Sequence, residues 1–107
     1  MSEAVQVLAP QGRLDSNNSD ELALQARELI GRGARRLLLD LKDLYYISSA
    51  GLRAVLMAAK EMTAVGGRLA IASPNSEVNE VFDISGFVSV IEVHRSAESA
   101  TAHLLRD

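Results

Sequence analysis

The sequence contains no cysteine and no tryptophan, and it has only two prolines, two phenylalanines and two tyrosines. Without cysteine the chain can form no disulfide, no thiolate metal site and no thiol nucleophile, which suits a reducing compartment. The formal net charge of −3 has the wrong sign for a surface that binds phosphate backbones, and stacking side chains are scarce. We therefore expect no direct contact with nucleic acid.

A long apolar run is missing as well. No stretch approaches the roughly 18 apolar residues of a membrane-spanning helix, and Met1–Ala4 is too short of apolar residues to be a targeting segment. We expect a soluble, cytoplasmic protein with no membrane insertion. Because 107 residues of 48% hydrophobic composition can close one core, we expect a single domain over residues 1–107.

Short apolar stretches alternate with stretches of helical spacing along the chain. Strands are predicted at residues 5–8 with a brief continuation at 12–15, then at 37–41, 69–72 and 87–93. Four helices are predicted between or after these strands, at about residues 19–31, 50–64, 76–84 and 97–105. This order predicts an α/β fold with a four- to five-stranded, mostly parallel (mixed) sheet, in which Pro10 marks an edge strand.

Three local patterns predict details of these helices. Asn18, three residues before Glu21, resembles a capping box at the start of the first helix. The apolar face of the third helix is assigned to Val78, Val81, Phe82 and Ile84. Leu105 is assigned to the apolar face of the last helix, whose N-cap is expected to be Ser96.

The stretch Tyr46–Arg53 is predicted to be a strand-to-helix corner. Ser48 and Ser49 stand where the first backbone N–H groups of a helix have no intrahelical partner and where the helix dipole favours negative charge. The commonest role of a serine at such a place is helix capping, and either of the two can fill it. The four residues that follow are Ala50, Gly51, Leu52 and Arg53. Two small residues thus clear space around the serines, and an apolar and a cationic side chain stand beside them.

Other candidates for chemistry are weaker. His94 and His103 match no metal-binding spacing and are expected to be solvated surface residues. Asp15, Asp40 and Asp43 are interpreted as caps and loop charges, and the glycines do not form a nucleotide-binding fingerprint. Since no nucleophile–base pair is visible, we expect no enzyme, no cofactor and no metal site.

Three segments resemble the signature of the STAS domains, and among them the anti-sigma factor antagonists of bacterial partner-switching systems. The segments are Gly12–Asp15, Leu39–Leu41 and Ile47–Leu52, and the order of elements fits nearly the whole chain. The family usually has an aspartate where this chain has Ser48. It also usually begins with a further N-terminal strand, which is short or missing here.

The resemblance implies a non-enzymatic binding module. When unphosphorylated, such a protein binds an anti-sigma factor with serine-kinase activity and so frees a sigma factor; phosphorylation releases it, and a serine phosphatase reverses the modification. By position Ser49 is the implied phosphorylation site, with Ser48 as the alternative. The implied partner-binding residues are Asp15, Ser16, Asn17, Ile47, Ser48, Ala50, Gly51, Leu52 and Arg53.

Two other classes of function stay open. A single domain of this family also serves as a binding or scaffold subunit, in stressosome-like assemblies or in lipid-transport complexes. A small-ligand sensor is the other alternative, because sheet ends in α/β folds commonly bind ligands.

Overall fold

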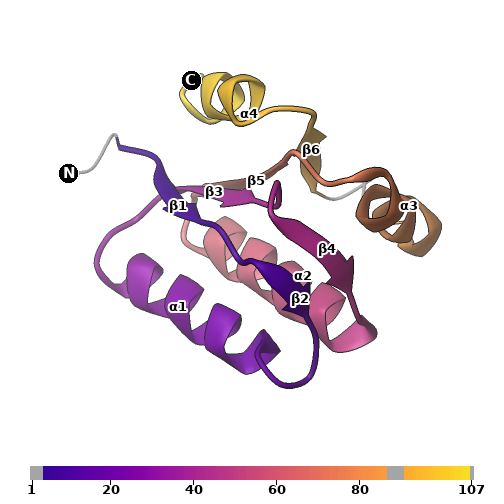
Figure 1. The fold of residues 1–107 in the computed structure, drawn as a ribbon. Helices are drawn as coiled ribbons and strands as arrows, with labels where there is room; N and C mark the ends of the chain where they lie inside the picture. Colours follow the sequence, from indigo (N-terminus) through magenta and orange to yellow (C-terminus); the bar gives the residue numbers. More distant parts are fainter. Residues whose placement is uncertain (1–3, 87–90, 107) are drawn as a thin grey trace.

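A computed structural model of the chain describes residues 4–86 and 91–106 and shows helices on both faces of a parallel sheet (Figure 1). The strands are β1 (Gln6–Leu8), β2 (Gly12–Leu14), β3 (Arg36–Asp40), β4 (Leu44–Ile47), β5 (Arg68–Ala72) and β6 (Glu92–His94). The helices are α1 (Ser19–Gly31), α2 (Ser49–Ala64), α3 (Ser76–Ser85) and α4 (Ala97–Leu104). The main sheet has the order β1-β3-β5-β6, and β2 pairs with β4 in a small second sheet. All four described pairings are parallel, so the predicted α/β fold is confirmed.

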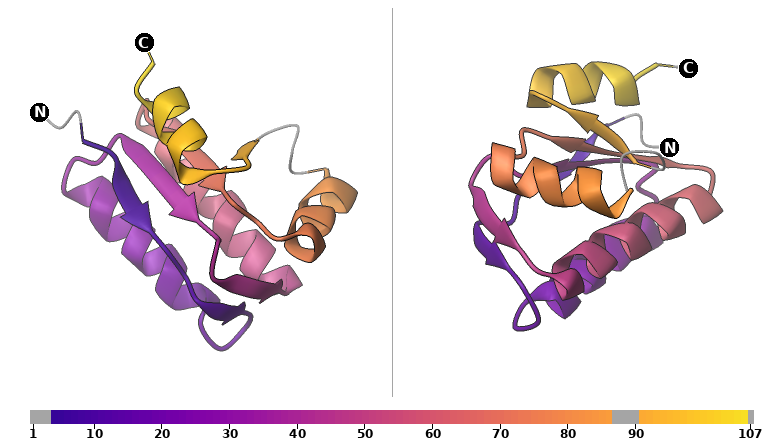
Figure 2. Two further views of the ribbon diagram at one scale, coloured as in Figure 1. Left: turned by 45° about the horizontal axis from the view of Figure 1, so that its top comes forward. Right: turned by 90° about the vertical axis from the view of Figure 1, so that its right-hand side faces the viewer.

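The two sheets arise because two neighbouring strands bend together. The chain leaves the main sheet after β1 and again after β3, and Gly12 N–H then donates to Asp43 O at 2.9 Å where pairing resumes. Asp40 stabilises the second bend, because its carboxylate accepts a hydrogen bond from Lys42 N–H at 3.1 Å. Beyond the bends β2 and β4 continue side by side, away from the main sheet (Figure 2). Their ends therefore lie at one corner of the molecule.

Strand β4 was not predicted from the sequence, because its side chains do not alternate. Leu44 and Ile47 are buried, whereas Tyr45 and Tyr46 between them are both exposed. The register explains this pattern: Gly12 pairs with Leu44, but the next residue of β2 pairs with Tyr46, which leaves Tyr45 as the extra residue of a bulge. A bulge puts two successive side chains on similar sides and so removes the period of two on which a strand prediction depends.

The main sheet is buried on both faces. Helices α1 and α2 cover one face and α4 covers the other (Figures 1 and 2). Strand β3 alternates accordingly, since Leu37 and Leu39 belong to clusters under α1 and α2, while Leu38 packs with Ala100 and Leu104 of α4. Strand β1 is the predicted edge strand, and the side chain of Val7 on it is exposed.

Three of the four helices in the described part of the chain begin at a side-chain cap. Ser48, Asn75 and Ser96 accept hydrogen bonds from the N–H groups of Gly51, Val78 and Ser99, respectively. The expected capping box at Asn18 is wrong. Its amide accepts from Asp15 N–H at 2.9 Å and donates to Arg13 O at 2.7 Å, so this side chain holds the preceding loop.

Two apolar residues were assigned to the wrong face. Ile84 is 80% exposed and Leu105 is 50% exposed, although Phe82 and Leu104 beside them are fully buried. Both residues lie at the C-terminal end of their helix. The helix makes no further turn there, so its apolar face does not continue. Of the last predicted strand, residues 87–90 lie outside the described part of the chain.

Each helix within residues 4–86 and 91–106 is too short or too polar to cross a membrane.

We expect Phe82→Ala to lower the free energy of unfolding by about 3–5 kcal/mol, since it would leave a cavity under α3. The matched control is Ile84→Ala in the same helix, which should change it by less than about 0.5 kcal/mol because that side chain is exposed. Urea unfolding followed by circular dichroism measures both. Equal losses in the two variants would contradict the packing described here.

Candidate functional site

The candidate site is the corner where β2 and β4 end together. Leu14 and Ile47 are paired at the ends of these strands, and Ser48 N–H donates to Leu14 O at 2.9 Å. The loop after β2 and the start of α2 therefore lie next to each other. The sequence places these two segments more than 30 residues apart, and the strand pairing brings them together.

The two serines of the corner have different environments. Ser48 is the N-cap of α2, is half-buried, and its Oγ accepts a hydrogen bond from Gly51 N–H at 3.2 Å. Ser49 is the first residue of the helix, and its side chain is exposed. Helix geometry leaves the N–H groups of Ser49 and Ala50 without intrahelical acceptors, so this helix end attracts negative charge. The capping role that the sequence left open between the serines falls to Ser48.

Gly51 lets α2 approach the end of β2 closely. A Cβ atom at this position would lie 2.7 Å from Leu14 O and 2.9 Å from Ile47 Cγ1, both closer than van der Waals contact permits. Gly51 and Ile47 are themselves buried. Gly51 and Ile47 therefore lie beneath the surface of the corner, where they hold the serines against the end of β2.

The loop that follows β2 is held by its own hydrogen bonds. Asp15 Oδ1 accepts from Asn17 N–H at 3.0 Å, and Asp15 O accepts from Ser19 N–H at 2.9 Å. Arg13 Nε lies 3.5 Å from Asp15 Oδ2. Asp15 therefore acts as a turn residue, in agreement with its interpretation as a cap or loop charge.

A shallow groove of about 380 Å³ runs between α1 and α2 next to the corner. Leu24 and Met57 on its walls are 55% and 38% exposed, which is high for large apolar side chains. Arg27 in the groove is paired with Glu61 at 2.8 Å. Arg53, at its end near Ser49, is exposed and has no ion-pair partner among the described residues.

The structure places the predicted site residues in three groups. The exposed ones are Ser16, Asn17, Ser49 and Arg53; the half-buried ones are Asp15, Ser48, Ala50 and Leu52; the buried ones are Ile47 and Gly51. All ten belong to the two segments that meet at the corner.

Sequence reasoning included Tyr46 in the corner stretch but assigned no role in the site to either tyrosine of β4. Tyr45 and Tyr46 are 59% and 40% exposed, and the guanidinium carbon of Arg13 lies 4.1 Å from the centre of the Tyr46 ring. With Ile47 and residues of α3 they line a second hollow, of about 210 Å³. The signal in the sequence was two adjacent aromatic residues in a chain that has only four in all.

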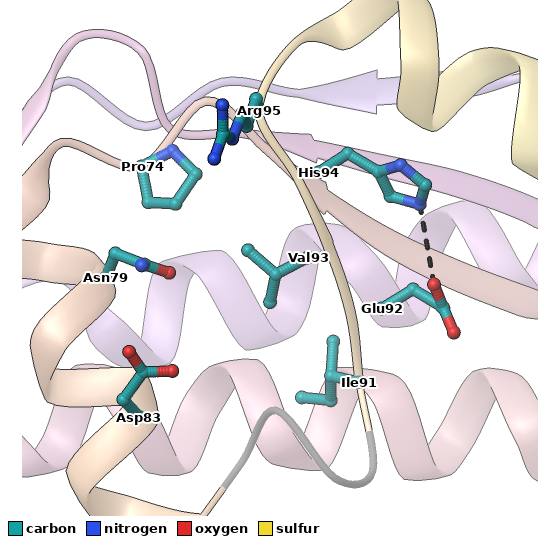
Figure 3. Close-up of a pocket in the computed structure, with 8 residues that line it drawn as sticks. All are labelled: Pro74, Asn79, Asp83, Ile91, Glu92, Val93, His94 and Arg95. Carbon is teal, nitrogen blue, oxygen red and sulfur yellow. Dashed lines mark ion pairs between the residues drawn. The ribbon is translucent and has the colours of Figure 1, made fainter.

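A third hollow lies where β5 and β6 end beside α3 (Figure 3). Its volume is about 380 Å³, and Pro74, Asn79, Asp83 and Arg95 contribute polar and apolar walls. This is the strand-end position at which α/β folds commonly hold ligands. Glu92 and His94 extend to the other side of β6, away from Asp83 and Asn79 (Figure 3).

The prediction that the histidines are solvated surface residues is wrong, because both are half-buried. Strand β6 and helix α4 bring the rings of His94 and His103 to 5.1 Å between centroids, and the side chain of His94 is only 16% exposed. Burial lowers the pKa of His103 and the cation of Arg68 lowers it further, whereas Glu92 raises it. The ring is therefore mainly neutral at pH 7. Sequence spacing hid this cluster because α4 folds back over the sheet.

The class of protein is indicated by two features together: an α/β fold with a parallel sheet, and a pair of serines at the start of α2. The family model of the STAS domain matches residues 2–100, and the chain belongs to that family. The resemblance seen in the sequence is confirmed.

The relatives make this assignment more specific. "Putative anti-sigma factor antagonist BtrV" of Bordetella bronchiseptica is 45% identical over 92 residues, which are 86% of this chain and 79% of that protein. The crystal structure of TM1081 from Thermotoga maritima has a TM-score of 0.90 at 23% identity and covers 95% of this chain and 88% of that one. SpoIIAA of Bacillus, solved in a phosphorylated form, has a TM-score of 0.73 at 23% identity, with coverage of 95% and 92%. The two structures share the fold of this chain.

We expect Gly51→Ala to destabilise the protein by about 1–3 kcal/mol, because its Cβ would be forced against Leu14 O. Gly31→Ala is the matched control, since it also lies in a helix but would meet no atom within 4 Å. That control should be neutral or stabilising, by up to about 1 kcal/mol. Chemical denaturation compares the two variants, and a stabilised Gly51→Ala protein would contradict the close approach.

The two serines should also differ in their effect on stability. Ser48→Ala removes the cap of α2 and should cost about 0.5–2 kcal/mol, whereas Ser49→Ala should cost less than about 0.5 kcal/mol. Thermal and urea unfolding measure both variants. The reverse order would assign the cap to Ser49 instead.

Proposed function

We propose that this protein is an anti-sigma factor antagonist of a bacterial partner-switching system. In its unphosphorylated state it binds an anti-sigma factor that has serine-kinase activity, and a sigma factor is released. The kinase then phosphorylates Ser49 and the complex separates; a serine phosphatase restores the binding state. In this role the protein is a binding module without catalytic activity. It regulates transcription only through its contacts with other proteins, and it works in the cytoplasm.

The relatives support the general role. BtrV is named as an anti-sigma factor antagonist, and its 45% identity extends over most of both chains. TM1081 and SpoIIAA support the fold alone, because each is 23% identical to this chain. The choice of residues therefore depends on the geometry of the corner.

One observation carries the choice of Ser49. Ser49 is an exposed residue at the first position of α2, whereas Ser48 is half-buried and its Oγ is already engaged as the cap. A kinase needs access to the hydroxyl that it modifies. Ser49 offers that access without loss of the cap, and Ser48 does not.

The free protein tolerates a phosphate at this place. A phosphoserine carries about −1.5 to −2 charges at pH 7. The N-terminus of α2 offsets part of that charge, by about 0.3–1 kcal/mol for each charge interaction. Arg53 lies four residues after Ser49 and hence on the same side of the helix, where it can reach the phosphate.

An interface formed over Ser49 does not tolerate the same phosphate. A complex that covers the corner removes water from the dianion, whose charge of about −1.5 to −2 Arg53 alone does not balance, and burying the remaining charge costs several kcal/mol. Since about 1.4 kcal/mol is a tenfold change in affinity, this cost is enough to release the partner. The modification therefore acts on the interface and leaves the fold intact.

We place the partner surface on the exposed and half-buried residues of the corner and on the adjoining groove. Ser16 and Asn17 form one side, Ser49 and Arg53 the other, and Leu24 and Met57 offer apolar contact area between α1 and α2. Exposed apolar side chains beside polar ones are typical of protein-binding surfaces.

Phosphosite mapping and partner recovery test this function together. Protein isolated from its native cells should carry phosphate on Ser49, and wild type and Ser49→Ala should co-purify a kinase-like protein. Ser49→Asp should bind that protein at least about tenfold more weakly, because it places a carboxylate in the interface.

Ser76→Asp is the matched control. Ser76 is likewise an exposed first residue of a helix, but it belongs to α3. That variant should keep the partner. Phosphate on Ser48 would assign the phosphorylation switch to that residue. Equal partner binding by all variants, with neither serine phosphorylated, would contradict the switch. A constitutive scaffold or ligand-sensing domain would then be left.

A further inference from the structure

Three side chains that can ligate a metal meet between β6 and α4. Glu92 and His94 are two residues apart on β6 and therefore extend to the same side of the strand, and His103 lies opposite them on α4. One ligand atom from each of the three residues lies within 4.8 Å of the other two. Helix α4 lies on the face of the sheet opposite α2, so a cluster formed between β6 and α4 is separate from the serine corner (Figure 2).

His94 is oriented by a hydrogen bond on one side of its ring. Its Nδ1 lies 2.8 Å from Ser99 Oγ, and Ser99 itself is fixed because its N–H donates to Ser96 Oγ at 3.0 Å. When Nδ1–H donates to Ser99, the other nitrogen, Nε2, carries a lone pair. Such outer hydrogen bonds are the usual way in which a ligand histidine is held.

The free side of His94 faces the Glu92 carboxylate. Nε2 is buried and has no hydrogen-bond partner among the described residues, and it lies 3.5 Å from Glu92 Oε1 (Figure 3). In the neutral tautomer with Nδ1–H donating to Ser99, Nε2 and Glu92 Oε1 both carry lone pairs, and their separation leaves room for a cation between them. Tetrahedral zinc with Zn–N and Zn–O bonds of about 2.0–2.2 Å spaces its ligands by about 3.4 Å.

Arg68 is the competitor at the third ligand. Its Nη2 lies 3.2 Å from His103 Nε2, and because arginine can only donate, the histidine accepts there. Arg68 Nη1 also donates to Arg106 O at 2.6 Å, so the guanidinium retains a partner if it leaves His103. A metal ion bound through His103 Nε2 would displace this hydrogen bond and lie near one positive charge.

We propose that Glu92, His94 and His103 form a binding site for a divalent transition-metal ion of the Zn²⁺ type. Two imidazoles and one carboxylate suit Zn²⁺, whereas Mg²⁺ and Ca²⁺ prefer oxygen ligands throughout. Water would fill the fourth position. The bound ion would join the last strand of the sheet to the helix that covers it and so stabilise the packing of α4.

Calorimetric titration of the untagged full chain with ZnCl₂ tests this proposal. Wild type should bind one equivalent saturably and should not bind MgCl₂ or CaCl₂. Glu92→Gln, His94→Ala and His103→Ala should each weaken Zn²⁺ binding by about tenfold or more, and Ser99→Ala by about tenfold through the lost hydrogen bond. Glu98→Gln is the matched control, because it removes an exposed carboxylate from the same helix as His103, and it should bind like wild type.

Arg68→Met should change the affinity for Zn²⁺ in the opposite direction. It removes the competing cation, so Zn²⁺ should bind more tightly than to wild type. Circular dichroism without metal checks that each variant is folded; Glu92→Gln changes an exposed side chain and keeps the test valid if a histidine variant unfolds. Absence of saturable binding by wild type, or equal affinity in wild type and Glu92→Gln, would overturn the site without affecting the proposed switch at Ser49.

Discussion

The geometry of the corner depends on one short parallel pairing, that of β2 with β4. A single hydrogen bond, from Ser48 N–H to Leu14 O, marks the point where the paired strands end and α2 begins. Gly51 then allows the first turn of the helix to rest directly on that carbonyl. The positions of both serines, and of the Asp15 loop beside them, follow from this contact. A looser pairing would leave the loop and the helix end unrelated in space.

Much of the fold was predictable because the main strands and helices have regular apolar spacing. Leu37, Leu38 and Leu39 predict a strand buried on both faces, and the structure shows them packed against opposite layers. The small sheet was not predictable in this way, since the bulge at Tyr45 removes the alternation of β4. Spacing also said nothing of His94 and His103, because their contact depends on how α4 folds back over β6. Local sequence determines local structure well, but contacts between distant segments depend on the register of strands.

The corner also shows why neighbouring serines are not equivalent. One position accepts the hydrogen bond that caps the helix, and the next is an exposed residue at the same helix end. The sequence motif can narrow the choice to two residues, but the assignment needs the backbone conformation. Here Ser48 has the extended conformation of an N-cap, with φ of −94° and ψ of 176°, whereas Ser49 is already helical. The helix cap and the exposed serine are thus adjacent residues.

The parallel pairing of all the described strands has a consequence for how the chain folds during synthesis. Parallel strands cannot be joined by a tight hairpin, so each pairing waits for the segment that crosses over between its two strands. Pairings of this kind close long loops before they gain contacts, which slows folding. The face formed by Leu38, Ala70 and Ala72 is completed later still, because it stays uncovered until residues 97–104 have left the ribosome. A nascent chain therefore exposes an apolar sheet face for a defined interval, during which a chaperone has a surface to bind.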